Sequence, residues 1–319
     1  MKKQIPILAA LFAFIALISA PDAAISSCRY GLRLCAELII PTLFPFFVLS
    51  ILLNILGLPS FIGKVLAPAA ARIYRISGAG ASALIIGLTG GYPLGAAYIA
   101  DMERNGAIDA EEGERLMGFC SNSGPAFIIG AVGSGVFHSG MIGILLYAIH
   151  IISAMITGLF FRSGEKCGLE YQPPRIDEVV PAAALVEAVK RASASLLSVC
   201  SFVILFSVFT GMLDCGGALS VVCGFISGIT GLELHFMKAL FFGLLELGSG
   251  VGAMQGLTAS PLCLSLAAGI VGWGGLSVQM QTAAVLYDSN IKGTLYLTGR
   301  LISAILSSVL AYLAGCVMF

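Results

Sequence analysis

Residues 79–104 read AGASALIIGLTGGYPLGAAYIADMER, an apolar stretch that is interrupted at its centre by Thr89-Gly90-Gly91-Tyr92-Pro93. Each apolar arm has only about 10 to 12 residues, whereas a helix that crosses a bilayer needs about 20. Non-helical backbone at membrane depth is tolerated only where it is buried in protein or lines a cavity. The stretch therefore predicts a re-entrant helical hairpin whose tip lies at the interruption.

The composition of the whole chain indicates an integral membrane protein. Of its 319 residues, 58% are hydrophobic and 11% are charged, whereas a soluble domain carries about 25% charged residues. This excludes a cytosolic enzyme, a nucleic-acid-binding protein with a basic face and a secreted disulfide scaffold. The nine cysteines contain no CxxC pair and the chain has no GxxxxGK[ST] loop, so we expect neither a metal nor a cofactor.

Three further interruptions resemble the first. A second hairpin is predicted over 234–257, with Glu246-Leu247-Gly248-Ser249-Gly250 at its middle. Discontinuous spanning helices are predicted around Asn122-Ser123-Gly124-Pro125 and Trp273-Gly274-Gly275. Uninterrupted spans are expected over residues 32–57, 140–161, 193–213 and 293–316, with Pro41 and Pro45 kinking the first.

The order of these elements in the first half of the chain recurs in the second. We predict an all-α polytopic membrane protein with two inverted repeats, each holding a re-entrant hairpin and a discontinuous transmembrane helix. An extra N-terminal helix, which follows Lys2-Lys3, is expected to be a retained span rather than a cleaved signal peptide. The predicted parts are an N-terminal transmembrane helix and loop (1–30), a first repeat (31–162), a cytoplasmic linker (163–191) and a second repeat (192–319).

Charge supports the inversion. The predicted surface segment of the first repeat, within 58–76, carries Lys64, Arg72 and Arg75, while its counterpart over 214–232 carries no basic residue. The positive-inside rule then places the first segment and the N-terminus in the cytoplasm, and an odd number of crossings per repeat inverts the second copy. In the competing interpretation, residues 216–231 cross the membrane and the repeats are parallel.

The four interruptions predict a binding site near the middle of the membrane. Broken helices expose helix ends and free carbonyl groups there, and transporters use both to bind polar ligands. We prefer Gln279 to Gln281 because it lies nearer its break. The candidate substrate-binding residues are Thr89, Gly90, Gly91, Tyr92, Asn122, Ser123, Gly124, Glu246, Ser249, Gly275, Ser277 and Gln279.

Glu246 is the most informative of these residues because it lies among Phe242, Leu245 and Leu247. A carboxylate in such surroundings needs a proton, a cation or hydrogen-bond donors to offset its desolvation. It is therefore expected to bind a coupling ion or a solute. The structural alternative is an ion pair with His150 or Arg300, which occupy equivalent places in the two repeats.

Three motifs together resemble those of the YlbJ-like sporulation integral membrane proteins. They are Gly90-Gly91-Tyr92-Pro93-Leu94-Gly95-Ala96, Asn122-Ser123-Gly124-Pro125 running into 127–133, and Gly274-Gly275-Leu276-Ser277-Val278-Gln279. Those proteins contain the Gate, or nucleoside-recognition, domain that also occurs in concentrative nucleoside transporters and the ferrous-iron transporter FeoB. The resemblance implies a multi-pass cell-membrane protein of endospore-forming bacteria that is linked to formation of the spore cortex.

Two functional hypotheses follow. The first is a secondary transporter of a small polar solute, nucleoside-like or ion-coupled, whose partners are the lipid bilayer, the solute and a coupling proton or cation. The second is a non-transporting membrane scaffold of a sporulation assembly. No nucleic-acid partner and no enzyme activity are expected, since Ser123 and His150 lack the acidic residue that a serine protease needs. Both hypotheses are compatible with a homo-oligomer.

Overall fold

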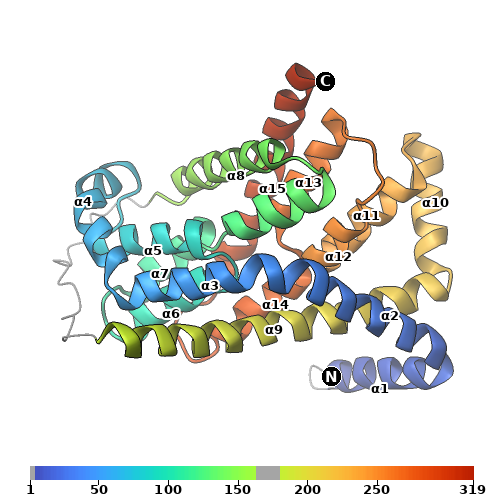
Figure 1. Cartoon of the computed structure of the whole chain (residues 1–319), viewed down its shortest axis with the longest axis horizontal. Coiled ribbons are helices and arrows are strands. Elements are labelled where there is room, and N and C mark those ends of the chain that lie inside the picture. The colour runs from blue at the N-terminus through green and yellow to red at the C-terminus, as the bar shows by residue number, and fades with distance from the viewer. Residues whose placement is uncertain (1–3, 163–179) are drawn as a thin grey trace.

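The computed structural model describes residues 4–162 and 180–319, and every regular element within these ranges is a helix (Figure 1). Five of the described helices are long and apolar enough to cross a bilayer. They cover Pro21–Ile55, Gly140–Phe160, Pro181–Cys215, Pro261–Leu286 and Thr294–Met318. The chain is thus an all-α polytopic membrane protein, as the sequence predicts.

The chain begins with α1 (Gln4–Ser19), which is followed at once by α2 (Pro21–Leu34), the π-helix η1 (Cys35–Ile39) and α3 (Ile40–Ile55). The prediction of a loop before residue 31 is therefore wrong. Pro21 is at the start of α2 and Asp22 is in its first turn, and both residues favour a helix start. The widened turn of η1 ends next to Pro41, which has no N–H to donate to the helix.

The first half continues with six helices, three of which begin at side-chain caps. The hydroxyl of Ser77 accepts a hydrogen bond from Gly80 N at 3.0 Å, and Asp109 accepts one from Glu112 N at 2.7 Å. Such a cap is worth about 0.5–2 kcal/mol relative to alanine. The helices are α4 (Leu58–Ile73), α5 (Gly78–Gly90), α6 (Leu94–Arg104), α7 (Ala110–Cys120), the π-helix η2 (Ala126–Val136) and α8 (Gly140–Phe160).

The second half follows in the same order. Its first helix runs without interruption from Pro181, so residues 181–191 of the predicted linker belong to a candidate spanning helix. The rest of the predicted linker, residues 163–179, lies outside the described part of the chain. α10 has 13 residues, or about 20 Å of helix, which is shorter than a bilayer core. The helices are α9 (Pro181–Cys215), α10 (Ala218–Thr230), α11 (Leu234–Leu245), α12 (Leu247–Gly252), α13 (Pro261–Trp273), α14 (Gly275–Leu286) and α15 (Thr294–Met318).

Where the two re-entrant hairpins are predicted, the structure has pairs of helices that fold back on each other. A Cβ added to Gly250 would clash with the Cα of Gly243, and one added to Gly95 would lie 2.9 Å from the Cα of Gly87. Glycine at these positions lets the two arms of α11–α12 and of α5–α6 pack backbone to backbone. The sequence interruptions therefore lie at the hairpin tips.

Two carboxylates of the first half hold the turn before α15 in the second half. Glu114 accepts hydrogen bonds from Gly293 N at 2.7 Å, Leu295 N at 2.8 Å and the Thr294 hydroxyl at 2.5 Å. Glu103 accepts one from Asn290 Nδ2 at 2.8 Å. Glu114 thus takes the place of a side-chain cap at the N-terminus of α15.

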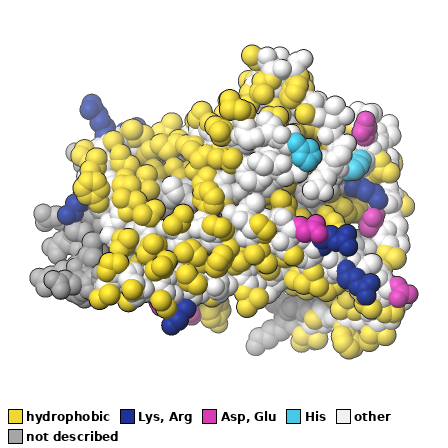
Figure 2. All heavy atoms as spheres, in the orientation of Figure 1, with side chains coloured by type: hydrophobic (Ala, Val, Ile, Leu, Met, Phe, Trp, Pro, Cys, Tyr) yellow, Lys and Arg dark blue, Asp and Glu magenta, His cyan; other side chains and the backbone are white. Residues whose placement is uncertain are grey.

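The outer surface fits a lipid environment. Hydrophobic side chains cover most of the face in Figure 2, and charged side chains gather mainly toward its right-hand end. Large apolar residues on the long helices are strongly exposed, among them Leu197 (70%), Leu205 (62%) and Ile305 (57%). Exposed apolar surface on this scale is typical of helices that contact lipid rather than water.

Candidate functional site

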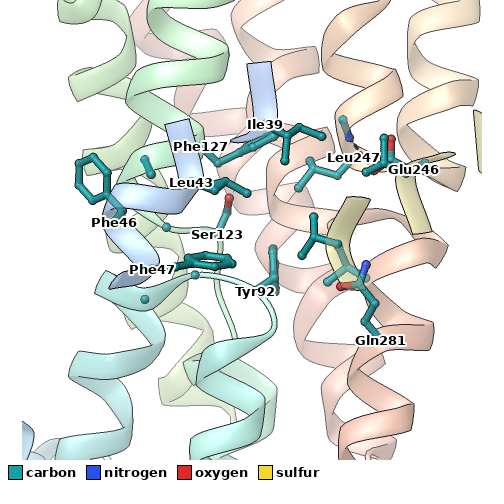
Figure 3. Close-up of a pocket in the computed structure, with 18 of the residues that line it drawn as sticks. Ile39, Leu43, Phe46, Phe47, Tyr92, Ser123, Phe127, Glu246, Leu247 and Gln281 are labelled. Carbon is teal, nitrogen blue, oxygen red and sulfur yellow. Dashed lines mark hydrogen bonds between the residues drawn. The ribbon is translucent and has the colours of Figure 1, made fainter. Parts of the chain in front are cut away.

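The tips of the two hairpins meet at a small cavity of about 50 Å³, here called the central cavity. Apolar side chains of η1 and α3 form one wall, while polar groups of the hairpin tips and α14 form the other (Figure 3). A cavity of this size has room for a few waters, and small-molecule sites are larger, at roughly 300 Å³ or more. In the described conformation the cavity is thus too small for a drug-sized molecule.

The tip of the first hairpin packs directly on the broken helix of its own half. Gly91 has a φ of +78°, which glycine adopts at no steric cost, and a Cβ at this position would lie 2.9 Å from Gly124 N. The Tyr147 hydroxyl donates a hydrogen bond to the Leu88 carbonyl at 2.9 Å. These contacts hold the Gly91–Pro93 tip and the Ser121–Gly124 break against each other.

A buried arginine from the second half completes this tip. Arg300 of α15 has no exposed surface, and its Nη1 donates to the Tyr92 hydroxyl at 2.7 Å. Nη1 and Nη2 both lie 3.3 Å from Oδ1 of Asn122. The guanidinium also lies within 6 Å of the ring centres of Tyr92 and Tyr296, as in cation–π contacts. Arg300 therefore joins the two halves beside the central cavity.

His150 of α8 contacts the same break from the other side. Its Nε2 accepts a hydrogen bond from the backbone N–H of Ser123 at 3.2 Å, so the ring proton is assigned to Nδ1. Nδ1 is buried with no hydrogen-bond partner among the described residues. The contact uses the backbone of Ser123 rather than its hydroxyl, so the geometry does not prepare Ser123 as a nucleophile.

Glu246 forms the tip of the second hairpin. Its carboxylate accepts hydrogen bonds from the backbone N–H groups of Gly248, at 2.8 Å, and of Ser249, which caps α12. The side chain is 2% exposed and lines the central cavity. None of the hydrogen bonds described for His150 or Arg300 reaches Glu246. The described contacts therefore give no support to the predicted structural pair.

The second broken helix reaches the cavity through Gln281 rather than Gln279. Gly274 and Gly275 both have positive φ, and a Cβ on Gly275 would lie 3.0 Å from Leu247 N at the Glu246 tip. Gln281 lines the central cavity and donates to the Ser277 hydroxyl at 3.3 Å. Gln279 lines a different, outward-facing groove along α9 and α15. The preference for Gln279 is not supported by this geometry.

Two larger recesses flank the central cavity. One, of about 730 Å³, lies between the start of α2 and the end of α9 and includes Ser207 and Ser249; it is called the hydroxyl recess. The other, of about 420 Å³, lies beside α4 and α6 and is called the α6 recess. Thr89 and Gly90 line both the α6 recess and the central cavity. The central cavity thus lies between two more open spaces.

The structure brings most of the predicted site residues together. Seven of them line the central cavity, namely Thr89, Gly90, Gly91, Tyr92, Ser123, Gly124 and Glu246. Three others lie behind these residues: Asn122 contacts Arg300, Gly275 packs on the Glu246 tip and Ser277 binds Gln281. The remaining two lie elsewhere, since Ser249 lines the hydroxyl recess and Gln279 lines the outward-facing groove. Arg300 and Gln281 are not among the predicted site residues.

Five candidate spans, two helical hairpins and two interrupted helices that meet at one cavity define a multi-pass α-helical membrane protein with paired broken helices. The chain is 32% identical, over 330 aligned residues, to the sporulation integral membrane protein YlbJ of Bacillus subtilis strain 168. The alignment covers 95% of this chain and 80% of that relative. The chain therefore belongs to the YlbJ family of sporulation integral membrane proteins. No family model and no solved structure matches it.

Proposed function

We propose that the protein is a secondary transporter, rather than an enzyme, that moves a small polar solute across the membrane by alternating access. The observation that carries the proposal is the convergence of both hairpin tips and both interrupted helices on one cavity that is lined by Glu246 and Gln281. Broken helices are costly in a bilayer unless their free backbone groups meet a cavity or a ligand. In the YlbJ family context, the solute would serve sporulation and formation of the spore cortex.

The order of the helices in the two halves supports inverted repeats, which are typical of proteins that work by alternating access. Each half has a long helix, a short helix, a hairpin, an interrupted helix and a final helix, in that order. The short helices α4 and α10 lie at opposite ends of the long axis in Figure 1, as an inverted pair would. In this proposal the hairpins are re-entrant, the N-terminus is cytoplasmic and α10 lies on the opposite surface.

The solute site is the central cavity in an opened form. At about 50 Å³ the cavity does not hold a nucleoside-sized molecule, so one hairpin must move to admit it. Glu246 would bind a hydroxyl or amine group of the solute or a coupling ion, and Gln281 and Tyr92 would add polar contacts. Because the sequence motifs resemble those of Gate-domain proteins, a nucleoside-like solute is the first class to test.

Solute-dependent thermal stabilisation of the purified full-length protein tests this proposal. A ligand that binds the folded state raises the melting temperature, so nucleosides, sugars, amino acids and monovalent cations are compared as classes. We expect one class to stabilise the wild type and not Glu246→Gln, while Glu37→Gln, a change at a side chain with 73% exposure, keeps the response. With that solute, Glu246→Gln is expected to abolish coupled uptake and leave expression intact.

Two outcomes would contradict the proposal. Either no class of solute stabilises the wild type, or Glu246→Gln responds as the wild type does. Both together would favour the alternative, in which the same fold is a non-transporting scaffold of a sporulation assembly.

A further inference from the structure

The hydroxyl recess is unusually polar for its position between two membrane-spanning helices. Six hydroxyl side chains line it, together with two carboxylates near its mouth. Polar groups at membrane depth almost always face water, a cavity or one another. The hydroxyl groups belong to Ser26, Ser27, Tyr30, Ser207, Thr210 and Ser249, and the carboxylates to Asp22 and Asp214.

The inner end of the recess is closed by two buried serines. Ser207 and Ser249 are 3% and 2% exposed, and their hydroxyl oxygens lie 3.2 Å apart, which is a hydrogen bond. A solute cannot pass between two side chains in direct contact. A proton can, because each hydroxyl both donates and accepts a hydrogen bond.

Beyond the two serines lies Glu246. The Ser249 side chain lies close to the Glu246 carboxylate, which accepts a hydrogen bond from the Ser249 backbone N–H. The hydroxyl groups of Ser207 and Ser249 thus lead from the recess toward Glu246. Glu246 itself lines the central cavity, so the carboxylate stands between the recess and the cavity.

We propose that the hydroxyl recess is the entry route for the coupling proton, which reaches Glu246 through the hydroxyl groups of Ser207 and Ser249. The inference rests on the proposed role of Glu246 in transport and names its coupling ion as a proton. Water in the recess gives a proton to the Ser207 oxygen, whose own proton passes to the Ser249 oxygen. The Ser249 proton then passes to the Glu246 carboxylate, so both serines end neutral and Glu246 gains one proton.

Protonation would also change the hairpin tip. The Glu246 carboxylate accepts two backbone hydrogen bonds from α12, and a neutral carboxyl group is a weaker acceptor than a carboxylate. Loading a proton would therefore weaken the cap that holds the tip closed. This links proton entry to the movement that solute binding requires.

Infrared spectroscopy of the full-length protein in vesicles tests the route without any solute. After an acid pH jump, the carboxylic C=O band that disappears in Glu246→Gln reports protonation of Glu246. We expect Ser249→Ala and, independently, Ser207→Ala to slow the appearance of this band at least tenfold. Ser201→Ala is the matched control because Ser201 lies on α9 with its hydroxyl bonded to the Leu197 carbonyl, and it should keep the wild-type rate.

The outcomes separate the route from the proposed function. If both serine variants keep their fold, judged by thermal unfolding, and the band appears at the wild-type rate, the relay is overturned. If no band depends on Glu246 at any pH, a proton is not the coupling ion and the relay is again overturned. Neither result changes the expected rise in melting temperature on solute binding, and that separate measurement tests the proposed solute site.

Discussion

Glu114 provides a direct test of how the two halves are joined. Its carboxylate accepts hydrogen bonds from Gly293 N, Leu295 N and the Thr294 hydroxyl at the start of α15. Glu114→Ala removes all three. Loss of an N-terminal cap costs about 0.5–2 kcal/mol, and loss of the charge at a helix N-terminus adds about 0.3–1 kcal/mol.

The expected loss is therefore about 1–3 kcal/mol of unfolding free energy. At about 2 °C per kcal/mol for a chain of this size, the melting temperature should fall by about 2–6 °C. The assay is thermal unfolding of the purified protein in one detergent. Glu111→Ala is the matched control, since Glu111 is exposed in the first turn of the same helix and its loss costs only the smaller charge term.

A melting temperature of Glu114→Ala equal to that of Glu111→Ala would refute the reasoning. It would mean that the turn before α15 is held by its apolar packing and that the Glu114 hydrogen bonds add nothing. Glu114→Gln should lie between the two because the amide keeps one acceptor oxygen.

Three other perturbations have defined outcomes. Gly250→Ala should lower the free energy of unfolding by about 1–3 kcal/mol, because its Cβ would clash with Gly243. Gly224→Ala, which has open space around it, should be neutral or stabilising. Equal melting temperatures of the two variants would exclude the close contact. Arg300→Lys should lower the melting temperature because lysine cannot place two nitrogens on one acceptor, and an unchanged value would show that charge alone suffices. In sealed vesicles, a membrane-impermeant maleimide should label Cys215, an exposed residue that lines the hydroxyl recess, only from the side of the membrane opposite the linker. Cys215→Ser is the control for labelling of other cysteines. Labelling of Cys215 from the linker side would contradict the inverted topology.

The helix breaks could be predicted because local chemistry sets them. Tyr92-Pro93 and Gly274-Gly275 interrupt apolar runs with residues that either lack an N–H donor or adopt positive φ. The loop predicted before residue 31 is helical in the structure, although it includes the charged residues Asp22 and Arg29. In the structure these charges lie on the exposed side of α2, while Gly31 and Leu34 are buried, so one face of a polar helix still packs.

The composition of the site depends on contacts that a sequence does not display. Arg300 lies 208 residues from Tyr92 and 178 from Asn122, and no local pattern links them. The choice between Gln279 and Gln281 depends on the rotation of α14 about its axis. Ser277 and Gln281 are four residues apart and therefore share a face of the helix. Because Ser277 is itself a predicted site residue, this spacing is the signal in the sequence that favours Gln281 over Gln279.

The two longest helices set a condition on the membrane itself. Pro21–Ile55 and Pro181–Cys215 each have 35 residues, or about 52 Å of helix, against a hydrocarbon core of about 30 Å. They run side by side in Figure 1, so the pair must tilt together or extend beyond the core. Hydrophobic mismatch then couples the tilt of this pair to bilayer thickness. Since the pair carries one wall of the central cavity, we expect lipid chain length to affect the shape of the cavity.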